Sequence, residues 1–62
     1  MDTKELRNQA AALLDQAQAA VEQGEMETFQ RLADEAQATM VKADEIDAAA
    51  SQVRKLRGEF NQ

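Results

Sequence analysis

The chain has 62 residues and contains no cysteine, histidine, proline, tryptophan or tyrosine; its only aromatic residues are two phenylalanines. The lack of cysteine excludes disulfide bonds and thiolate metal sites, and leaves the redox compartment undetermined. The lack of histidine removes the imidazole base and a common zinc ligand. Two phenylalanines alone provide no surface on which the bases of a single-stranded nucleic acid could stack.

Basic residues are scarce as well. Seven Lys and Arg are outnumbered by twelve Asp and Glu, which gives a formal net charge of −5. Nucleic acids and anionic membrane surfaces attract clustered positive charge, so we expect neither as a partner. No apolar run approaches the roughly 20 residues of a transmembrane helix, and the first residues do not form a signal peptide. The sequence therefore predicts a cytoplasmic protein.

Side chains that could perform chemistry are not grouped anywhere in the sequence. The serine and the three threonines have no base near them, and Gly24 and Gly58 are isolated, so neither a nucleophile nor a phosphate-binding loop is predicted. The acidic groups in residues 34–35 and 44–47 lack the ligand spacing of a calcium loop, and we interpret them as a solvated helix face. We expect no enzymatic activity, cofactor, metal or small-molecule substrate.

What the chain does contain is a long amphipathic stretch from Phe29 to Phe60. Steps of three and four residues along it define a heptad seam, the pattern by which one helix packs along another. Eight of its ten residues are apolar, and the residues between them are mostly charged or Gln. The seam consists of Phe29, Leu32, Ala36, Thr39, Ala43, Ile46, Ala50, Val53, Arg57 and Phe60.

A shorter helix is predicted before it, from about residue 3 to about residue 23. Asp2 suits the N-cap position, and Glu5, three residues later, completes a variant of the capping box. The apolar stripe of this helix consists of Leu6, Ala10, Leu13, Ala17 and Ala20, with Leu14 and Val21 on its shoulder.

Gly24 decides how the two stretches are connected. Continuing the first stripe from Ala17 by threes and fours leads to Gly24, Thr28 and Arg31, which do not suit a seam. The second seam starts out of step, at Phe29, as expected if the chain reverses direction. Glycine suits the left-handed residue that commonly ends a helix, so we predict a turn at about residues 24–25 and a second helix from about 26 to 60.

The predicted fold is all-α: an antiparallel two-helix hairpin with a long second helix, coiled-coil-like and self-associating. The first helix covers the second only to about residue 48 or 49, and the end of the second helix extends beyond it. Either that end needs a partner or it frays, as chain termini do. We predict that helix–helix contacts involve Leu6, Leu13, Ala17, Val21, Phe29, Leu32, Ala36, Ala43, Ile46, Ala50, Val53, Leu56 and Phe60, with Gly24 in the turn.

Charge is distributed unevenly along the chain. Residues 15–47 hold nine acidic and two basic residues, whereas residues 48–62 hold three basic residues and one acidic residue. One interpretation is ordinary helix electrostatics, with acids early and bases late in the second helix. The other is that the basic tip docks on an acidic partner or on a neighbouring copy of the chain.

Several short segments follow one another in a recognisable order around the glycine turn. They are Leu6-Arg7, Ala11-Ala12-Leu13-Leu14-Asp15, Phe29-Gln30-Arg31-Leu32 with Glu35, Glu45-Ile46-Asp47 and Val53-Arg54-Lys55-Leu56. In this order they resemble the N-terminal region of major capsid proteins of tailed bacteriophages of the Hong Kong 97 type. In that family the segment is called the delta or scaffolding domain.

The resemblance implies a helical segment without an active site. In the family, this segment gathers capsid subunits during prohead assembly, lies inside the shell in the host cytoplasm, and is usually removed by the maturation protease. The resemblance therefore favours an assembly module whose partners are other copies of itself or other helices of the same assembly.

Other functions are compatible with the same sequence. A small helical adaptor or regulatory protein could place the apolar stripe of its second helix into a groove of a different protein. A piece of a longer helical bundle would show the same periodicity. A helix lying on a membrane surface is disfavoured, because the polar faces are not basic.

Overall fold

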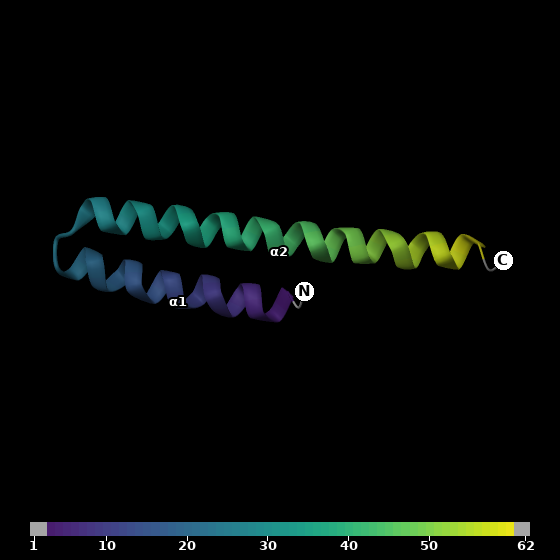
Figure 1. The fold of residues 1–62 in the computed structure, drawn as a ribbon, viewed down its shortest axis with the longest axis horizontal. Helices are drawn as coiled ribbons and strands as arrows, with labels where there is room; N and C mark the ends of the chain where they lie inside the picture. The colour runs from purple at the N-terminus through teal and green to yellow at the C-terminus, as the bar shows by residue number, and fades with distance from the viewer. Residues whose placement is uncertain (1–2, 61–62) are drawn as a thin grey trace.

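The computed structural model describes residues 3–60, which form two helices (Figure 1). Helix α1 spans Thr3–Glu22 and helix α2 spans Met26–Phe60. The helices lie side by side, run in opposite directions and are joined by a short turn, so the predicted antiparallel helical hairpin is confirmed. Asp2, the expected N-cap, lies outside the described residues.

The turn is a helix C-cap of the Schellman type. The N–H of Glu25 donates to the carbonyl of Ala20 (2.8 Å), and the N–H of Gly24 donates to the carbonyl of Val21 (3.0 Å). These two bonds satisfy carbonyls that the end of α1 leaves without intrahelical partners. They require a left-handed residue, and Gly24 supplies it with a φ of 75°.

The interface between α1 and α2 consists mainly of alanine. Five of the seven buried residues are alanines, and each buries little apolar surface, so the interface contributes little free energy per helical turn. Small side chains also allow the two helices to approach closely. The buried residues are Leu6, Ala10, Ala17 and Ala20 in α1 and Leu32, Ala36 and Ala43 in α2.

Thr39 occupies a half-buried position on the seam without leaving its hydroxyl unsatisfied. Its Oγ1 donates to the carbonyl of Glu35, one turn earlier in the same helix, at 2.8 Å. A threonine whose hydroxyl bonds within its own helix can present its methyl group to the neighbouring helix. This explains how a polar residue can stand on an otherwise apolar seam.

The hairpin is elongated and has a large surface for its mass. It measures 58 × 15 × 13 Å, and its radius of gyration is 16.5 Å, against about 11 Å for a compact chain of this length. The accessible surface is 5026 Å², whereas a compact monomer of 6.9 kDa is expected to expose about 4,000 Å².

Within residues 3–60, neither helix has the length and apolarity needed to cross a membrane.

Candidate interaction surface

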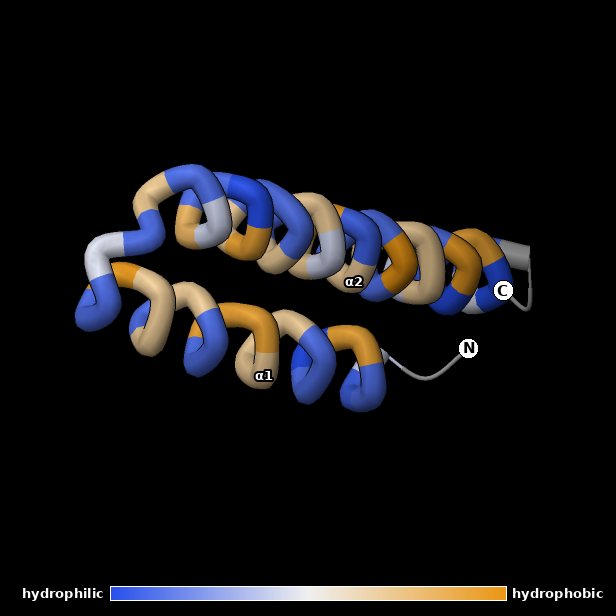
Figure 2. Tube along the Cα trace, turned by 60° about the vertical axis from the view of Figure 1, so that its left-hand side comes forward, coloured by the Kyte–Doolittle hydropathy of each residue, from blue (hydrophilic) through white to orange (hydrophobic). Residues whose placement is uncertain are grey.

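The end of α2 extends beyond α1, and no other part of the described residues 3–60 covers it (Figure 1). We call residues 48–60 the overhang, which is about 20 Å long at 1.5 Å per residue. Every side chain from 47 to 59 is exposed, although Figure 2 shows that apolar residues recur in this part of α2 as they do in α1. Val53 is 48% exposed and Leu56 is 52% exposed.

The structure brings together most of the predicted contact residues within the hairpin. Leu6, Ala17, Leu32, Ala36 and Ala43 are buried, and Leu13, Phe29 and Ile46 are half-buried. Val21, Ala50, Val53 and Leu56 are exposed, and the side chain of Phe60 lies outside the described residues. Beside Val21, Ala20 is the residue that packs against α2. The four exposed residues are therefore available only to a partner outside the hairpin.

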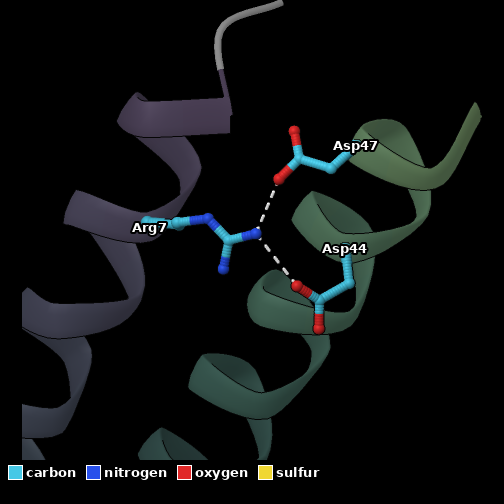
Figure 3. A network of polar contacts seen from close by, with 3 residues as sticks. All are labelled: Arg7, Asp44 and Asp47. Atoms are coloured by element: carbon cyan, nitrogen blue, oxygen red, sulfur yellow. Dashed lines mark hydrogen bonds and ion pairs between the residues drawn. The ribbon is translucent and has the colours of Figure 1, made fainter. Parts of the chain in front are cut away.

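A cluster of three charged side chains joins α1 to α2 near the start of the overhang (Figure 3). One guanidinium nitrogen of Arg7, Nη2, lies 2.9 Å from Oδ1 of Asp44 and 2.7 Å from Oδ2 of Asp47. All three side chains are about half exposed or more, so solvent screens the attraction between them. The cluster shows which sides of the two helices adjoin.

The cluster changes the protonation equilibria of its members. The hydrogen bond from Arg7, followed by one from the Thr3 hydroxyl, lowers the pKa of Asp47 below that of an ordinary aspartate. The hydrogen bonds to Asp47 and then to Asp44 raise the pKa of the Arg7 guanidinium. Both effects favour the charged forms, so the cluster is a structural ion pair across the hairpin.

The Arg7–Asp47 contact identifies an apolar surface along one side of the hairpin. Residues seven apart lie on the same side of a helix in a coiled coil, so Arg7 shares its side of α1 with residues 14 and 21. By the same spacing, Asp47 shares its side of α2 with residues 26, 33 and 40. Because Arg7 binds Asp47, these two rows border each other. We call the apolar members the flank: Leu14, Val21, Met26, Ala33 and Met40.

Apart from the half-buried Ala33, the flank is exposed, and it differs from the opposite side of the hairpin. Leu14 and Val21 are 45% and 44% exposed, and both methionines are exposed as well. The corresponding rows on the opposite side of the buried stripes contain glutamines in α1 and polar or charged residues in α2. They are Gln9, Gln16 and Gln23, and Thr28, Glu35 and Lys42. Only one side of the hairpin is therefore apolar enough to bury against another helix.

The apolar residues of the overhang do not lie on the flank side of α2. Ala49 and Leu56 are seven residues apart and continue the row of Glu35 and Lys42, which lies opposite the flank. Val53 continues the neighbouring row, that of Thr39 and Ile46, which packs on α1 further back in the hairpin; it borders Leu56 and widens the apolar stripe. The flank and the apolar stripe of the overhang thus face in different directions on the same molecule.

The overhang and the turn end of the hairpin carry opposite charge. The overhang contains three basic residues and one acidic residue. The end of the hairpin near the turn, residues 8–30, contains no basic residue, and its acids are Asp15, Glu22, Glu25 and Glu27. The acidic end lies far from the overhang of the same molecule, at the opposite end of α2 (Figure 1).

The acidic side chains do not form a metal site within the described part of the chain. No group of three or more potential ligands converges in residues 3–60. Asp44 and Asp47 instead share one arginine, which explains why these acids lie close together. What the arrangement can do is present two apolar helical surfaces to other helices.

Sequence reasoning did not identify the flank or the Arg7 cluster. The signal was present, because residues 14, 21, 26, 33 and 40 repeat at intervals of seven. It could not be interpreted without knowing which rows of α1 and α2 adjoin. The contacts of Arg7 with Asp44 and Asp47 answer this question, and they join residues that are 37 and 40 positions apart in the sequence.

No protein-family model, curated protein or solved structure matches this chain. The resemblance to capsid scaffolding segments therefore rests on the short sequence segments described above, and membership of that family stays a prediction.

Proposed function

We propose that this chain is a non-enzymatic helical assembly module that associates with other copies of itself through the overhang of α2. The observation that carries the proposal is the length difference between the helices: α1 has 20 residues and α2 has 35. The extra length is fully helical and exposes Val53 and Leu56. A helix end with exposed apolar residues is stabilised when another helix covers it.

A single contact of this kind is weak. Val53 and Leu56 are each only about half exposed in the hairpin, so burying the rest of both side chains contributes about 1.5–3 kcal/mol in total. Association costs at least about 4 kcal/mol in lost translational and rotational freedom. Weak contacts become effective when many copies are held together, because each further contact forms at high effective concentration. They also allow incorrect contacts to dissociate, which suits the assembly of a large shell.

The exposed overhang and the order of the short sequence segments together support a more specific role. We propose that the chain is the scaffolding segment of a phage major capsid protein, which directs the association of subunits during prohead assembly. The alternative is an adaptor that places the stripe of α2 into a groove of a different protein. Self-association distinguishes the two, because the adaptor would be monomeric by itself.

Sedimentation equilibrium over a wide concentration range tests the proposal. We expect reversible association of the full chain, and at least about tenfold weaker association of Val53→Asp, because a carboxylate would be buried in an apolar contact. Ser51→Asp is the matched control, since it introduces the same charge two residues earlier, on the opposite side of α2 from Val53. A chain ending at Ser51 should behave like Val53→Asp.

A full chain that is monomeric at every concentration would contradict self-association and favour the adaptor. Association that is equally strong in Val53→Asp and in the chain ending at Ser51 would show that the overhang is not the contact surface. Circular dichroism of each variant verifies that the hairpin is still helical.

A further inference from the structure

The structure points to the surface that receives the overhang: we propose that the overhang of one copy packs on the flank of a second copy, in a head-to-tail contact. This inference rests on the proposed self-association and specifies its geometry. The flank comprises Leu14, Val21, Met26, Ala33 and Met40, and it lies on the Arg7 side of the hairpin. The overhang would be the third helix beside α1 and α2 of the second copy.

Apolar surface is the first reason to choose the flank. Leu14 and Val21 in α1 and the two methionines in α2 are all exposed in the single chain. A helix lying along the flank contacts both α1 and α2, and so it buries more apolar surface than it would against one helix. The polar row that contains Gln9 and Gln16 offers no comparable surface.

Size is the second reason. The flank extends from Val21 to Leu14 in α1 and from Met26 to Met40 in α2, and the α2 part is about 21 Å long at 1.5 Å per residue. The overhang, residues 48–60, is about 20 Å long. One overhang therefore spans one flank without leaving much of either surface exposed.

Charge is the third reason. The basic residues of the overhang would lie near the turn end of the second copy, where residues 8–30 carry four acids and no base. Pairing of two overhangs would instead bring Arg54, Lys55 and Arg57 of one copy close to the same residues of the other. Like charges at such an interface disfavour that arrangement.

The relative positions of the two surfaces make the contact head-to-tail. Within the apolar stripe of the overhang, Leu56 lies on the side of α2 opposite the flank, and Val53 continues the row of Leu32, Thr39 and Ile46 that packs on α1, so neither residue lies on the flank side. A closed pair with two reciprocal contacts would need both surfaces on the same side of this straight helix (Figure 1). A copy bound through its overhang therefore keeps its own flank available for a third copy, and association can continue.

Complementation between two variants tests this geometry. Val53→Asp disables the overhang but leaves the flank intact, and Leu14→Lys places a positive charge on the flank, where the basic overhang would have to bind. Both residues are exposed in the single chain, so both variants should keep the helical circular dichroism of the hairpin. Gln16→Lys is the matched control for the flank, because it adds the same charge to the polar side of α1.

We expect each variant alone to associate at least about tenfold more weakly than the unchanged chain, which is a loss of about 1.4 kcal/mol or more. An equimolar mixture should form a heterodimer and nothing larger, because one functional overhang and one functional flank remain. The unchanged chain should form a series of oligomers, and Gln16→Lys should behave in the same way.

The other outcomes separate this inference from the proposed function. If Leu14→Lys associates as strongly as the unchanged chain, or if the mixture stays monomeric, the flank is not the docking surface and the inference is wrong. Loss of association in Val53→Asp would still support the overhang as the assembly surface. If the unchanged chain is monomeric at every concentration, the proposed self-association fails as well.

Discussion

Among single residues, Gly24 is the most difficult to substitute, because of its backbone conformation. Its φ of 75° belongs to the left-handed region, and a Cβ built on it would contact no atom within 4 Å. The requirement for glycine is therefore a property of the backbone and not of the available space. Gly58, the other glycine, lies within α2 and has no positive φ.

Substitution of Gly24 by alanine should destabilise the hairpin. An L-residue in the left-handed region costs about 1–2 kcal/mol, and we expect the free energy of unfolding to fall by this amount. Urea denaturation followed by circular dichroism measures it. Gly58→Ala is the matched control: in a helix, alanine is favoured over glycine by about 1 kcal/mol, so this variant should not lose stability. Equal losses in both variants would contradict the assigned role of Gly24.

At the same scale, Asp47 makes the stability of the hairpin depend on pH. Because its pKa is lower in the folded chain than the ordinary value of about 3.9, its contribution to stability is complete above about pH 4. The contribution is lost as the pH falls through the lower, folded-state pKa. We expect Asp47→Asn to be less stable than the unchanged chain near neutral pH, and this difference to disappear in acid.

The control for this prediction is Asp34→Asn. Within the described residues 3–60, Asp34 forms no ion pair, so its replacement should not produce the same pH-dependent difference. Thermal unfolding at a series of pH values measures both variants. A stability difference for Asp47→Asn that persists unchanged below the folded-state pKa would contradict the role of its ionised form.

At the scale of the helices, the hairpin depends on close approach across small side chains. Ala36 and Ala43 are fully buried on α2, and Ala10 and Ala17 are buried on α1. In an alanine interface of this kind, the small volume of the side chains sets the distance between the two helices, since any larger side chain would push them apart. It also contributes little apolar burial, which explains why the hairpin has surface left for a partner.

Enlarging Ala36 should therefore destabilise the pair of helices. Ala36→Leu adds volume to a position with no exposed surface, and overpacking of this kind costs about 1–3 kcal/mol. Gln37→Leu introduces the same residue at the adjacent, exposed position of α2, and its effect should stay within about 0.5 kcal/mol. Urea denaturation at a fixed protein concentration compares them. Equal stability of Ala36→Leu and the unchanged chain would show that the helices can separate without cost.

At the scale of the whole molecule, shape and charge favour association over isolation. The hairpin has more surface than a compact monomer of its mass, and both its overhang and its flank are apolar. The overhang is locally basic, whereas the turn end of the hairpin is acidic. In the proposed head-to-tail contact, one copy contributes its overhang and the next copy contributes its flank. Under the proposed function, such contacts would bring many copies of the chain together reversibly.

This whole-molecule property should appear in thermal unfolding. Association that involves only folded chains stabilises them by mass action, so Tm should rise with protein concentration. In Val53→Asp, Tm should be independent of concentration over the same range. Scanning calorimetry at several concentrations measures both, and a Tm of the unchanged chain that does not vary with concentration would contradict association of the folded state.

The sequence by itself determined the local structure of this protein. Period-3.6 spacing and the change of phase at Gly24 predict two antiparallel helices of unequal length, because these features depend only on residues within a few turns of each other. The exposed end of α2 follows from the difference between the predicted lengths of the two helices. Ala20 could be placed on the buried stripe for this reason as well.

Only the tertiary structure decided which sides of the two helices adjoin. The flank is one surface because Arg7 reaches Asp44 and Asp47 across the hairpin, and helical spacing within one segment contains no information on that pairing. Val21 illustrates the difference: its spacing suits a helix contact, but the approach of α2 buries Ala20 and leaves Val21 exposed. Periodicity determines the rows of each helix, whereas their alignment depends on how close-packed side chains and charges from distant segments fit together.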